Sequence, residues 1–433
     1  MPGTALRCTT SSSWAPRDEI APVCAESAPG AYEVRSNGSE GCYGGWDLFF
    51  AIPDSPWVRI RVTADIEDLE RGLDSIRAAL VWNSDAFPGL NWEPVLATGQ
   101  TGATVTFEGE APVPDGAERI LLRLLMCWSA TGRMVWSDVQ VEGIPAPAPR
   151  QWRLAAGGGS PGNGERTIEK NTEAYLGFCR EAAEKGADLL CLPEVMLTTG
   201  LPSGPSTLVE QAITIPGPET EPFQEFCRES KMVLCFSAWE RSEELVANTA
   251  MLIDRDGQIA GTYRKVHLAA PLEPWWGVTP GHDFPVHNVH GACIAMNICM
   301  DSSVAESARV PAMQGAEILC MPIMGDQRAV TGWTGGPSDF DIDRWRAIQS
   351  VRAMDNQLHM VVSRNNGLGT CIVSPTGEVL DMLQGRRRIA YADVDLSARP
   401  RTWLHSTFVG SEHWVRRQPT YTPLVSGTIR NIG

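Results

Sequence analysis

The chain has 433 residues, of which 43% are hydrophobic and 20% are charged. This length exceeds what one hydrophobic core of ordinary size accommodates, so we expect two domains. Acidic residues outnumber basic ones by 52 to 36, which gives a formal net charge of -16. A nucleic acid or an anionic membrane would call for clustered Lys and Arg, so we expect neither as a partner.

The first part of the chain, residues 1–145, has the pattern of a β-sandwich. Period-two alternation recurs in short segments separated by turn-rich stretches, at 57–65, 77–82, 103–109, 117–128 and 133–142. The order of these features resembles jelly-roll modules of the carbohydrate-binding or galactose-binding type, which makes a glycan a candidate ligand. We expect its tryptophans to pack in the core instead of forming a sugar platform, namely Trp46, Trp82, Trp92, Trp128 and Trp136. We also expect this module to restrict substrate access without taking part in the chemical step.

A proline-rich segment follows, with three prolines at alternate positions between 143 and 151. Such a run is typical of a stiff linker, which we place at 146–150. Beyond it, residues 151–396 alternate buried strands with helical patterns, as in an α/β domain with a mixed sheet. The helical patterns occupy 165–186, 303–315 and 339–356.

Three residues whose side chains could take part in catalysis each follow a predicted buried strand in this second domain: Glu194, Lys265 and Cys299. Strand ends are where α/β sheets bind ligands, because side chains there point into an open crevice. Each residue alone has an ordinary alternative, as a helix cap, a surface lysine or an inert thiol. Their joint occurrence, at separations of 71 (265 − 194) and 34 (299 − 265) residues, favours a catalytic group.

The segments around these residues resemble motifs of the carbon–nitrogen hydrolase, or nitrilase, superfamily. GADLLCLPE is similar to its glutamate motif, GTYRKVHL to its lysine motif, and ICMDSSVAESARVPAMQGAEILCMP to its cysteine motif. Further segments match in order, so the resemblance spans nearly all of 151–396. It implies a four-layer α-β-β-α sandwich that forms a homodimer or a higher homo-oligomer.

Within the tail at 397–433, the segment RRQPTYTPLV resembles the family's C-terminal segment. The aromatic residues of the tail follow no regular period, as expected for an arm that lies on a partner subunit: Trp403, Phe408, Trp414 and Tyr421. We therefore predict that this tail is an oligomer contact.

The chemistry of such a trio follows from the weak electrophilicity of an amide carbon, which requires a nucleophile stronger than water. Cys299 is then the nucleophile, Glu194 the general base and acid, and Lys265 the oxyanion stabiliser. Ser303 and Glu306 form a capping-box pattern, which predicts a helix that begins at Ser303. Its positive end would favour the thiolate of Cys299.

Two further residues are weaker candidates for contact with the substrate or the oxyanion. Glu273 stands where family members often carry a second glutamate, although a loop carboxylate is an open alternative. Met300 directly follows the cysteine, where nitrilases proper have Trp-Glu. Ser302 and Ser303 occupy positions where carbamoylase-like members carry arginines that grip a carboxylate. We therefore expect a linear amide substrate without a required carboxylate, with an N-carbamoyl amide or a nitrile as alternatives.

Competing interpretations are weaker. Residues 157–162 fit the pattern G-x-G-x-x-G of a dinucleotide-dependent oxidoreductase, but the acidic residue ending the next strand is 32 residues beyond Gly162 (194 − 162), where about 20 is expected. His282, His287 and His290 lie close together, but Pro285 prevents the helix that would align them on a metal. A non-catalytic binding scaffold is disfavoured because all three family residues are present. We expect no cofactor and no metal.

Cysteine usage favours a reducing, cytoplasmic location. The twelve cysteines are spread along the chain and lack the spacings of a disulfide framework or a zinc site. The first residues lack the continuous apolar stretch of a signal peptide. The longest apolar run is interrupted by Arg123 and falls short of the roughly 20 residues of a membrane span.

Overall fold

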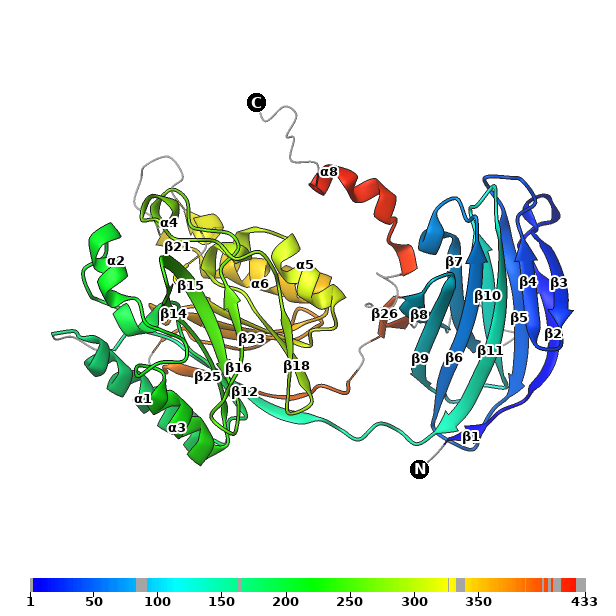
Figure 1. Ribbon diagram of the computed structural model, residues 1–433. Coiled ribbons are helices and arrows are strands. Elements are labelled where there is room, and N and C mark those ends of the chain that lie inside the picture. Colours follow the sequence, from blue (N-terminus) through cyan, green and yellow to red (C-terminus); the bar gives the residue numbers. More distant parts are fainter. Residues whose placement is uncertain are drawn as a thin grey trace. The chain divides into compact units, whose positions relative to one another are not determined.

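The computed structural model describes residues 3–82, 92–161, 165–325, 327–331, 339–385, 387–398, 401–403, 406–407 and 414–425. The chain divides into two compact units (Figure 1). One comprises Met1–Ala148 and Arg399–Gly433, and the other comprises Pro149–Ala398. No helix in these described ranges is long and apolar enough to span a membrane.

The first unit is built from antiparallel strands, which confirms the expected all-β architecture. Its strands are β1 (Thr4–Ala5), β2 (Cys8–Trp14), β3 (Val23–Ala28), β4 (Ala31–Arg35), β5 (Tyr43–Ala51), β6 (Trp57–Glu67), β7 (Ile76–Trp82), β8 (Trp92–Thr101), β9 (Thr104–Pro112), β10 (Arg119–Cys127) and β11 (Arg133–Ile144). They pair in the order β2-β5-β10-β7-β8-β9-β6-β11-β4-β3, with β1 on β11. Short 3₁₀ helices, η1 (Asp18–Ile20) and η2 (Gly72–Ser75), lie in the connections.

Period-two alternation forms the core of this unit. In β6, Val58, Ile60 and Val62 are buried while Arg59 and Arg61 point outward, because successive side chains of a strand face opposite sides. Among the tryptophans expected in the core, three are buried in it: Trp46, Trp82 and Trp136. The other two, Trp92 and Trp128, are only half-buried.

Part of the C-terminal tail packs on this same unit. The rings of Trp414 and Trp92 lie 5.2 Å apart, and Arg77 Nε donates to the Trp414 carbonyl at 3.2 Å. The guanidinium of Arg417 lies 4.5 Å from the Trp128 ring centre. These contacts cover the half-buried tryptophans.

The tail also forms β26 (Arg401–Trp403), β27 (Ser406–Thr407), η6 (Gln418–Tyr421) and α8 (Thr422–Val425). Phe408 and the side chain of Trp403, both named in the prediction of an intersubunit arm, lie outside the described residues. The role of the tail as an oligomer contact stays a prediction.

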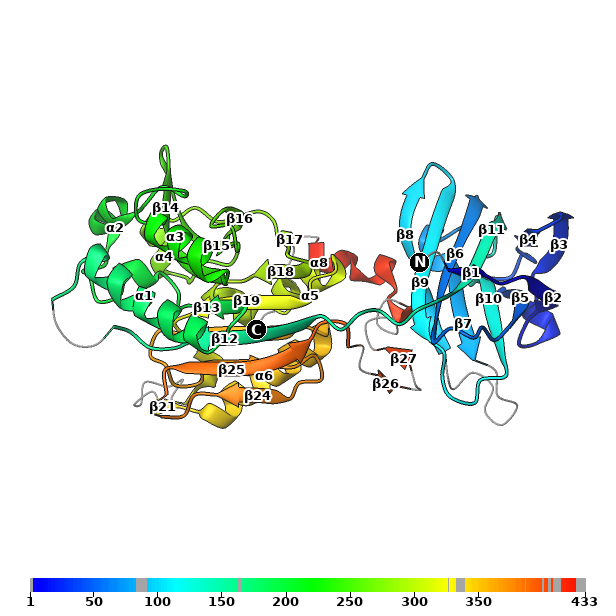
Figure 2. The same ribbon diagram turned by 90° about the horizontal axis from the view of Figure 1, so that it is seen from below.

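The second unit contains two six-stranded sheets (Figure 2). Both are mixed, as the sequence pattern predicts for a sheet of this domain. The first sheet has the order β16-β15-β14-β13-β12-β25, formed by β12 (Gln151–Gly157), β13 (Leu189–Cys191), β14 (Val233–Ser242), β15 (Leu245–Ile253), β16 (Ile259–Arg264) and β25 (Ile389–Asp395). The second has the order β17-β18-β19-β22-β23-β24, formed by β17 (Val286–Val289), β18 (Ala292–Met296), β19 (Ile318–Ile323), β22 (His359–Arg364), β23 (Cys371–Val373) and β24 (Val379–Met382). In each sheet the three central strands are parallel.

Helices cover the outer face of each sheet, which makes four layers. An apolar core fills the space between the sheets. A second core packs α1 (Ile168–Glu184) and α3 (Glu221–Ser230) on the first sheet, and a third packs α5 (Glu306–Met313) and α6 (Ile342–Asn356) on the second (Figure 1). The remaining elements are α2 (Pro205–Gln211), α4 (Leu272–Trp275), β20 (Val330–Thr331), β21 (Asp339–Phe340), η3 (Met196–Thr198), η4 (Cys299–Ser303) and η5 (Gln327–Ala329).

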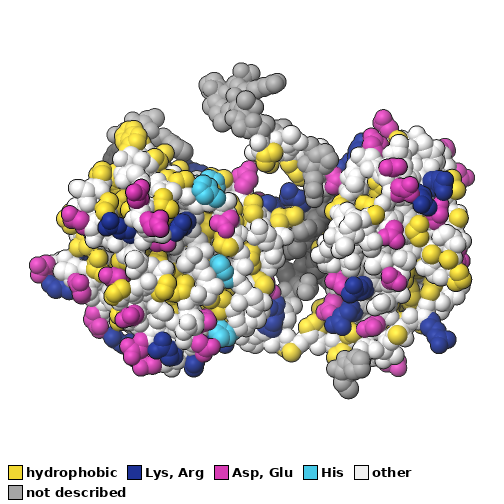
Figure 3. All heavy atoms as spheres, viewed as in Figure 1, with side chains coloured by type: hydrophobic (Ala, Val, Ile, Leu, Met, Phe, Trp, Pro, Cys, Tyr) yellow, Lys and Arg dark blue, Asp and Glu magenta, His cyan; other side chains and the backbone are white. Residues whose placement is uncertain are grey.

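Charged side chains of both signs are interspersed on the face of each unit seen in Figure 3. Such mixing on this face differs from the clustered basic surface that binds polyanions.

Candidate active site

The predicted glutamate and lysine meet although the strands that precede them, β13 and β16, are separated by β14 and β15 in the first sheet. Glu194 follows β13 and Lys265 follows β16, and their side chains are 3% and 1% exposed. Lys265 Nζ lies 3.0 Å from Glu194 Oε1. The structure therefore brings together two residues that are 71 positions apart (265 − 194) in the chain.

Glu273, the less certain candidate, belongs to the same cluster. It lies in α4, and its carboxylate oxygens are 2.9 and 3.0 Å from Lys265 Nζ. The lysine thus contacts two buried carboxylates at once. Burial alone lowers the pKa of Lys265, but the charges of Glu194, Cys299 and Glu273 more than offset this, so its pKa is raised above the usual value and the ammonium stays charged.

Asn248 is a member of the cluster that the sequence analysis missed. Its Nδ2 donates to Glu194 Oε1 at 2.9 Å and to Glu273 Oε1 at 3.1 Å. Its backbone carbonyl accepts from the Lys265 backbone amide at 2.9 Å. Asn248 is buried in the middle of β15. A polar amide inside the apolar run LVANTAMLID was the available signal, since a buried amide requires partners.

The predicted nucleophile lies close to the same cluster. Cys299 follows β18 and begins the 3₁₀ helix η4, and its Sγ lies 3.7 Å from the Gly325 carbonyl oxygen. The neighbouring Met324 amide donates to Glu194 Oε2 at 3.0 Å, and burial together with the negative charge of Glu194 raises the pKa of the Cys299 thiol. The three predicted side chains therefore converge on one site.

Cys299 has an unusual backbone conformation. Its φ is 44°, in the left-handed region that non-glycine residues rarely occupy. Such conformations persist where surrounding contacts enforce them. Here, Asp301 enforces the turn: its carboxylate accepts from the Ile298 amide at 2.8 Å and from the Tyr263 hydroxyl at 2.7 Å.

His267 supplies two further contacts to Asp301. Its amide donates to Asp301 Oδ1 at 3.1 Å, and its Nδ1 lies 2.8 Å from the same oxygen. Asp301 is fully buried, so these partners satisfy a carboxylate that water does not reach. The sequence analysis did not identify Asp301, Tyr263 or His267 as a supporting group.

Two expectations about the cysteine were wrong. The helix does not begin at Ser303: that residue ends η4, and α5 begins at Glu306 with Ala305 as its N-cap and no side-chain cap. The thiolate is not favoured in the free protein either. Burial, followed by the negative charge of Glu194, raises the pKa of Cys299 to about 12, while Lys265 lowers it only in part.

Met300 occupies the second position of η4 and is half-buried, directly beside Cys299. Its proximity to the thiol follows from its place in the chain. A contact with substrate stays a prediction.

The histidines considered as metal ligands do not gather in the described part of the second unit. His287 lies in β17, and His290 Nε2 accepts from the Arg255 amide at 3.2 Å. Among the described residues, three side chains do meet as potential ligands: Cys191, Cys235 and Cys320, whose sulfur atoms lie within 4.8 Å of one another. They are buried in the apolar core between the sheets, as small hydrophobic side chains are.

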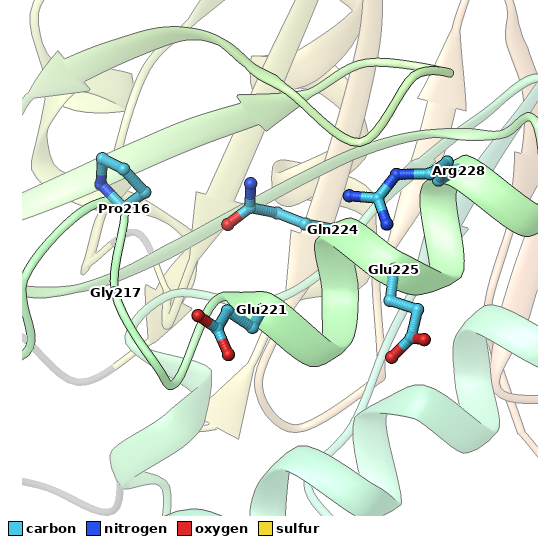
Figure 4. Close-up of a pocket in the computed structure, with 6 residues that line it drawn as sticks. All are labelled: Pro216, Gly217, Glu221, Gln224, Glu225 and Arg228. Carbon is cyan, nitrogen blue, oxygen red and sulfur yellow. The ribbon is translucent and has the colours of Figure 1, made fainter.

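A separate pocket of about 580 Å³ lies beside α3, lined by Pro216, Gly217, Glu221, Gln224, Glu225 and Arg228 (Figure 4). Gln224 Nε2 donates to the Gly257 carbonyl at 2.9 Å, and its Oε1 accepts from Thr220 at 2.8 Å. None of the six lining residues is a nucleophile or belongs to the cluster around Lys265. The reactive side chains described above therefore lie in the cluster around Lys265 and not in this pocket.

Comparisons with known proteins agree with this geometry. The model of the carbon–nitrogen hydrolase family matches residues 153–401. The omega-amidase NIT2 of Homo sapiens is 28% identical over 243 residues, which cover 52% of this chain and 83% of that protein.

Solved structures share the fold. A carbon–nitrogen hydrolase from Helicobacter pylori G27 superposes with a TM-score of 0.54 at 21% identity, covering 65% of this chain and all of that one (100%). An amidase of the nitrilase superfamily from Nesterenkonia AN1 gives 0.50 at 20% identity, covering 64% and 99%. The second unit therefore has the predicted nitrilase-like sandwich fold. The chain belongs to the carbon–nitrogen hydrolase family, and the enzyme is an amidase-like thiol hydrolase.

Proposed function

We propose that the enzyme hydrolyses a linear amide through a thioester on Cys299. The observation that carries this proposal is the convergence of Cys299, Glu194 and Lys265, all buried or partly buried, at the strand ends of one unit. A buried thiol beside a carboxylate and a fixed ammonium provides a nucleophile, a base and an electrostatic stabiliser.

The first half-reaction forms the thioester. Cys299 Sγ attacks the amide carbon while Glu194 takes the thiol proton, which suits a thiol that is neutral at rest. Lys265 stabilises the negative oxygen of the tetrahedral intermediate. The carbon–nitrogen bond then breaks, and Glu194 returns the proton to the leaving nitrogen, which departs as ammonia from a primary amide.

The second half-reaction releases the acid. Glu194 takes a proton from a water molecule, which attacks the thioester carbon. The carbon–sulfur bond breaks, and the sulfur recovers a proton from Glu194. We propose that Glu273 and Asn248 act as positioning residues, because they hold Lys265 and Glu194 through the contacts of 2.9–3.1 Å described above.

An amide is favoured over the two alternatives, a nitrile and an N-carbamoyl amide. Met300 and Asp301 stand where nitrilases proper carry Trp-Glu, and Ser302 and Ser303 replace the arginines of carbamoylases. The amidase names of the relatives support the same choice.

The test is ammonia release from matched panels of amides, nitriles and carbamoyl compounds. We expect turnover of amides that is lost in Cys299→Ala and retained in Cys293→Ala. Cys293 is a suitable control because it lies near the start of β18, the strand that precedes Cys299, away from the cluster. Turnover confined to nitriles or carbamoyl compounds would overturn the amide assignment.

We infer that the first unit is a jelly roll of the carbohydrate-binding type. Its antiparallel strands and aromatic contacts support this, since Tyr43 lies 6.2 Å from Trp14 and 5.5 Å from Trp128. Glycan-array binding that a Trp14→Ala variant loses would support a sugar ligand. Absence of binding across the array would leave restriction of substrate access as its proposed role.

We propose that the enzyme is a cytoplasmic homodimer or higher homo-oligomer. All twelve cysteines are free, as in proteins of reducing compartments. Val310 of α5 and Val351 and Met354 of α6 are 36%, 50% and 41% exposed, so an outer helical face of the second unit carries apolar side chains that a partner copy could cover. Light scattering at micromolar concentration tests this, and a monodisperse monomer would contradict it.

A further inference from the structure

Three buried thiols meet between the two sheets of the second unit, apart from the catalytic side chains. Cys191 and Cys235 are register partners in the parallel strands β13 and β14 of the first sheet, and Cys320 lies in β19 of the second. Their sulfur atoms lie within 4.8 Å of one another, and all three residues are 0% exposed. A single buried thiol packs as a small hydrophobic side chain. Here three strands from two sheets bring three soft donor atoms together.

The spacing of these sulfur atoms suits one bound ion. Three thiolates at about 2.3 Å from a single ion, in a planar arrangement, lie about 4 Å apart. The sulfur atoms, all within 4.8 Å of one another, reach this spacing by small rotations of their side chains. Because the ligands come from both sheets, an ion bound to them would join the sheets.

The surroundings of the three thiols select the kind of ion. Thiolate and thioether ligands favour copper(I), zinc and iron–sulfur clusters. Structural zinc takes four ligands and an iron–sulfur cluster takes four thiolates, but no fourth Cys, His, Asp or Glu among the described residues joins the group. Water does not reach these buried side chains to complete a tetrahedral site.

A further soft donor lies in the same core. Met296 of β18 is the register partner of Cys320, and both residues belong to the apolar core between the sheets. A thioether suits copper(I) as a thiolate does. A site that offers sulfur atoms and excludes water therefore fits copper(I) better than zinc.

The three thiols belong to strands that lead to the catalytic residues. Cys191 precedes Glu194 by three residues at the end of β13. The amide of Asn297 donates to the Cys320 carbonyl at 3.0 Å, and Asn297 precedes Cys299 by two residues. An ion held by the thiols would thus connect the segment that carries the base with the sheet that carries the nucleophile.

We propose that Cys191, Cys235 and Cys320 bind one copper(I) ion, which joins the two sheets of the catalytic unit. Bonds form between the ion and the three sulfur atoms, the displaced thiol protons pass to solvent, and the ion keeps its oxidation state. Because the site is closed to solvent, the ion enters during folding, before the sheets close on each other. This proposal is independent of the proposed function and revises the expectation that the protein binds no metal.

The test is the copper content of the full-length protein made in cells grown with added copper, so that the ion is present during folding. The protein is purified without oxygen and dialysed against a copper(I) chelator, which strips exposed thiols such as Cys8. We expect about one copper per chain and a Tm at least about 5 °C above that of protein made without copper. Absence of retained copper, or retention of zinc alone from cells given both metals, would overturn the proposal.

Variants locate the ion. Cys235→Ala and Cys320→Ala should each retain less than about 0.1 copper per chain, because each removes a ligand. Cys179→Ala is the matched control, since it removes a buried thiol of α1 from the core on the outer face of the first sheet, and it should keep the full copper content. Copper retention by a folded Cys235→Ala equal to that of the native protein would overturn the proposal.

X-ray absorption at the copper edge of the native protein decides the proposal if neither ligand variant folds. A shell of sulfur neighbours alone supports it, while nitrogen or oxygen neighbours would place the ion elsewhere and overturn it.

Cys299→Ala separates this proposal from the proposed function. The variant should lose amide turnover and keep its copper, because the catalytic cysteine is not one of the three ligands. Loss of copper in this variant would show that the ion binds at the catalytic cysteine, and the proposed site would be wrong.

Discussion

Lys265 is a buried lysine that contacts two buried carboxylates at once, those of Glu194 and Glu273. Glu194 and Glu273 repel each other, and the ammonium between them offsets that repulsion. Asn248 adds a donor to each carboxylate. The same contacts that stabilise the charges also hold the base and the ammonium in position for attack on a carbonyl group.

Replacement of this lysine should therefore cost stability as well as activity. Lys265→Met leaves two buried carboxylates without a cation, and breaking such a pair costs about 3–5 kcal/mol. We expect a loss of that size in the free energy of unfolding, measured with urea, together with loss of turnover. The variant Lys231→Met removes an exposed ion pair. It should change the free energy of unfolding by no more than about 1 kcal/mol and should leave turnover unchanged. A Lys265→Met protein as stable as the native one would contradict the electrostatic account.

Cys299 should behave differently, since its thiol does not support the core. Cys299→Ala and Glu194→Gln are expected to lower kcat/KM by about 10,000-fold or more while the circular dichroism spectrum is unchanged. Cys299→Ser should be nearly inactive, because a carboxylate is a weak base for an alcohol. Activity above a few per cent in Cys299→Ala would rule out the thioester route.

The pKa of Cys299 predicts the pH dependence of its alkylation. A pKa raised to about 12 means that the thiolate fraction of the free enzyme is small and rises about tenfold per pH unit between pH 7 and 9. The rate of iodoacetamide labelling, followed on the Cys299 peptide by mass spectrometry, should rise in the same way without a plateau. A plateau below pH 8 would indicate a preformed thiolate and contradict the proposed proton transfer to Glu194.

At the scale of elements, the short 3₁₀ helix η4 decides where the nucleophile points. The strand β18 and the helix α5 are joined by a turn that Asp301 organises through Ile298, Tyr263 and His267. The left-handed backbone of Cys299 depends on this turn. A buried carboxylate thus acts as a positioning residue for a sulfur atom two residues away.

Substitution of Asp301 tests the positioning role. Asp301→Asn keeps the volume but cannot accept all the same hydrogen bonds, so the turn should shift. A displacement of about 1 Å is enough to lower kcat by about 100-fold. We expect this loss in kcat with little change in KM, and a smaller loss in Tyr263→Phe, which removes one of the contacts. A KM effect without a kcat effect would assign Asp301 to substrate binding instead.

At the scale of the whole molecule, the division into units assigns all candidate catalytic residues to Pro149–Ala398. The C-terminal segment belongs with the first unit, where Trp414 packs against Trp92 and Arg417 lies over Trp128. Removal of residues 1–148 alone therefore leaves the C-terminal segment without the surface against which Trp414 packs.

Two truncated proteins distinguish these contributions. A fragment of residues 149–398 should be soluble and hydrolyse amides, because the core of the second unit lies within it. A fragment of residues 149–433 should associate more strongly in light scattering, since Trp414 would be exposed. If only the longer fragment were active, the tail would contribute to the catalytic unit and this division would be wrong.

Local sequence patterns predicted much of the architecture. Apolar runs gave the buried strands of the second unit, and the alternation in β6 predicted the all-β first unit, because side-chain periodicity is a property of neighbouring residues. The same patterns marked Glu194, Lys265 and Cys299, since each is a reactive residue placed directly after a buried strand. Their catalytic roles stay predictions that the variants above test.

Tertiary structure alone decided which groups surround those residues. Asn248 and Glu194 are 54 positions apart, and the Met324 amide that donates to Glu194 is 130 positions from it. The start of α5 at Glu306 in place of Ser303, and the seating of Trp414 on Trp92, likewise depend on contacts between distant segments. Such contacts arise when separate elements pack, and the free energy of that packing, not the local sequence, selects the partners of each buried charge.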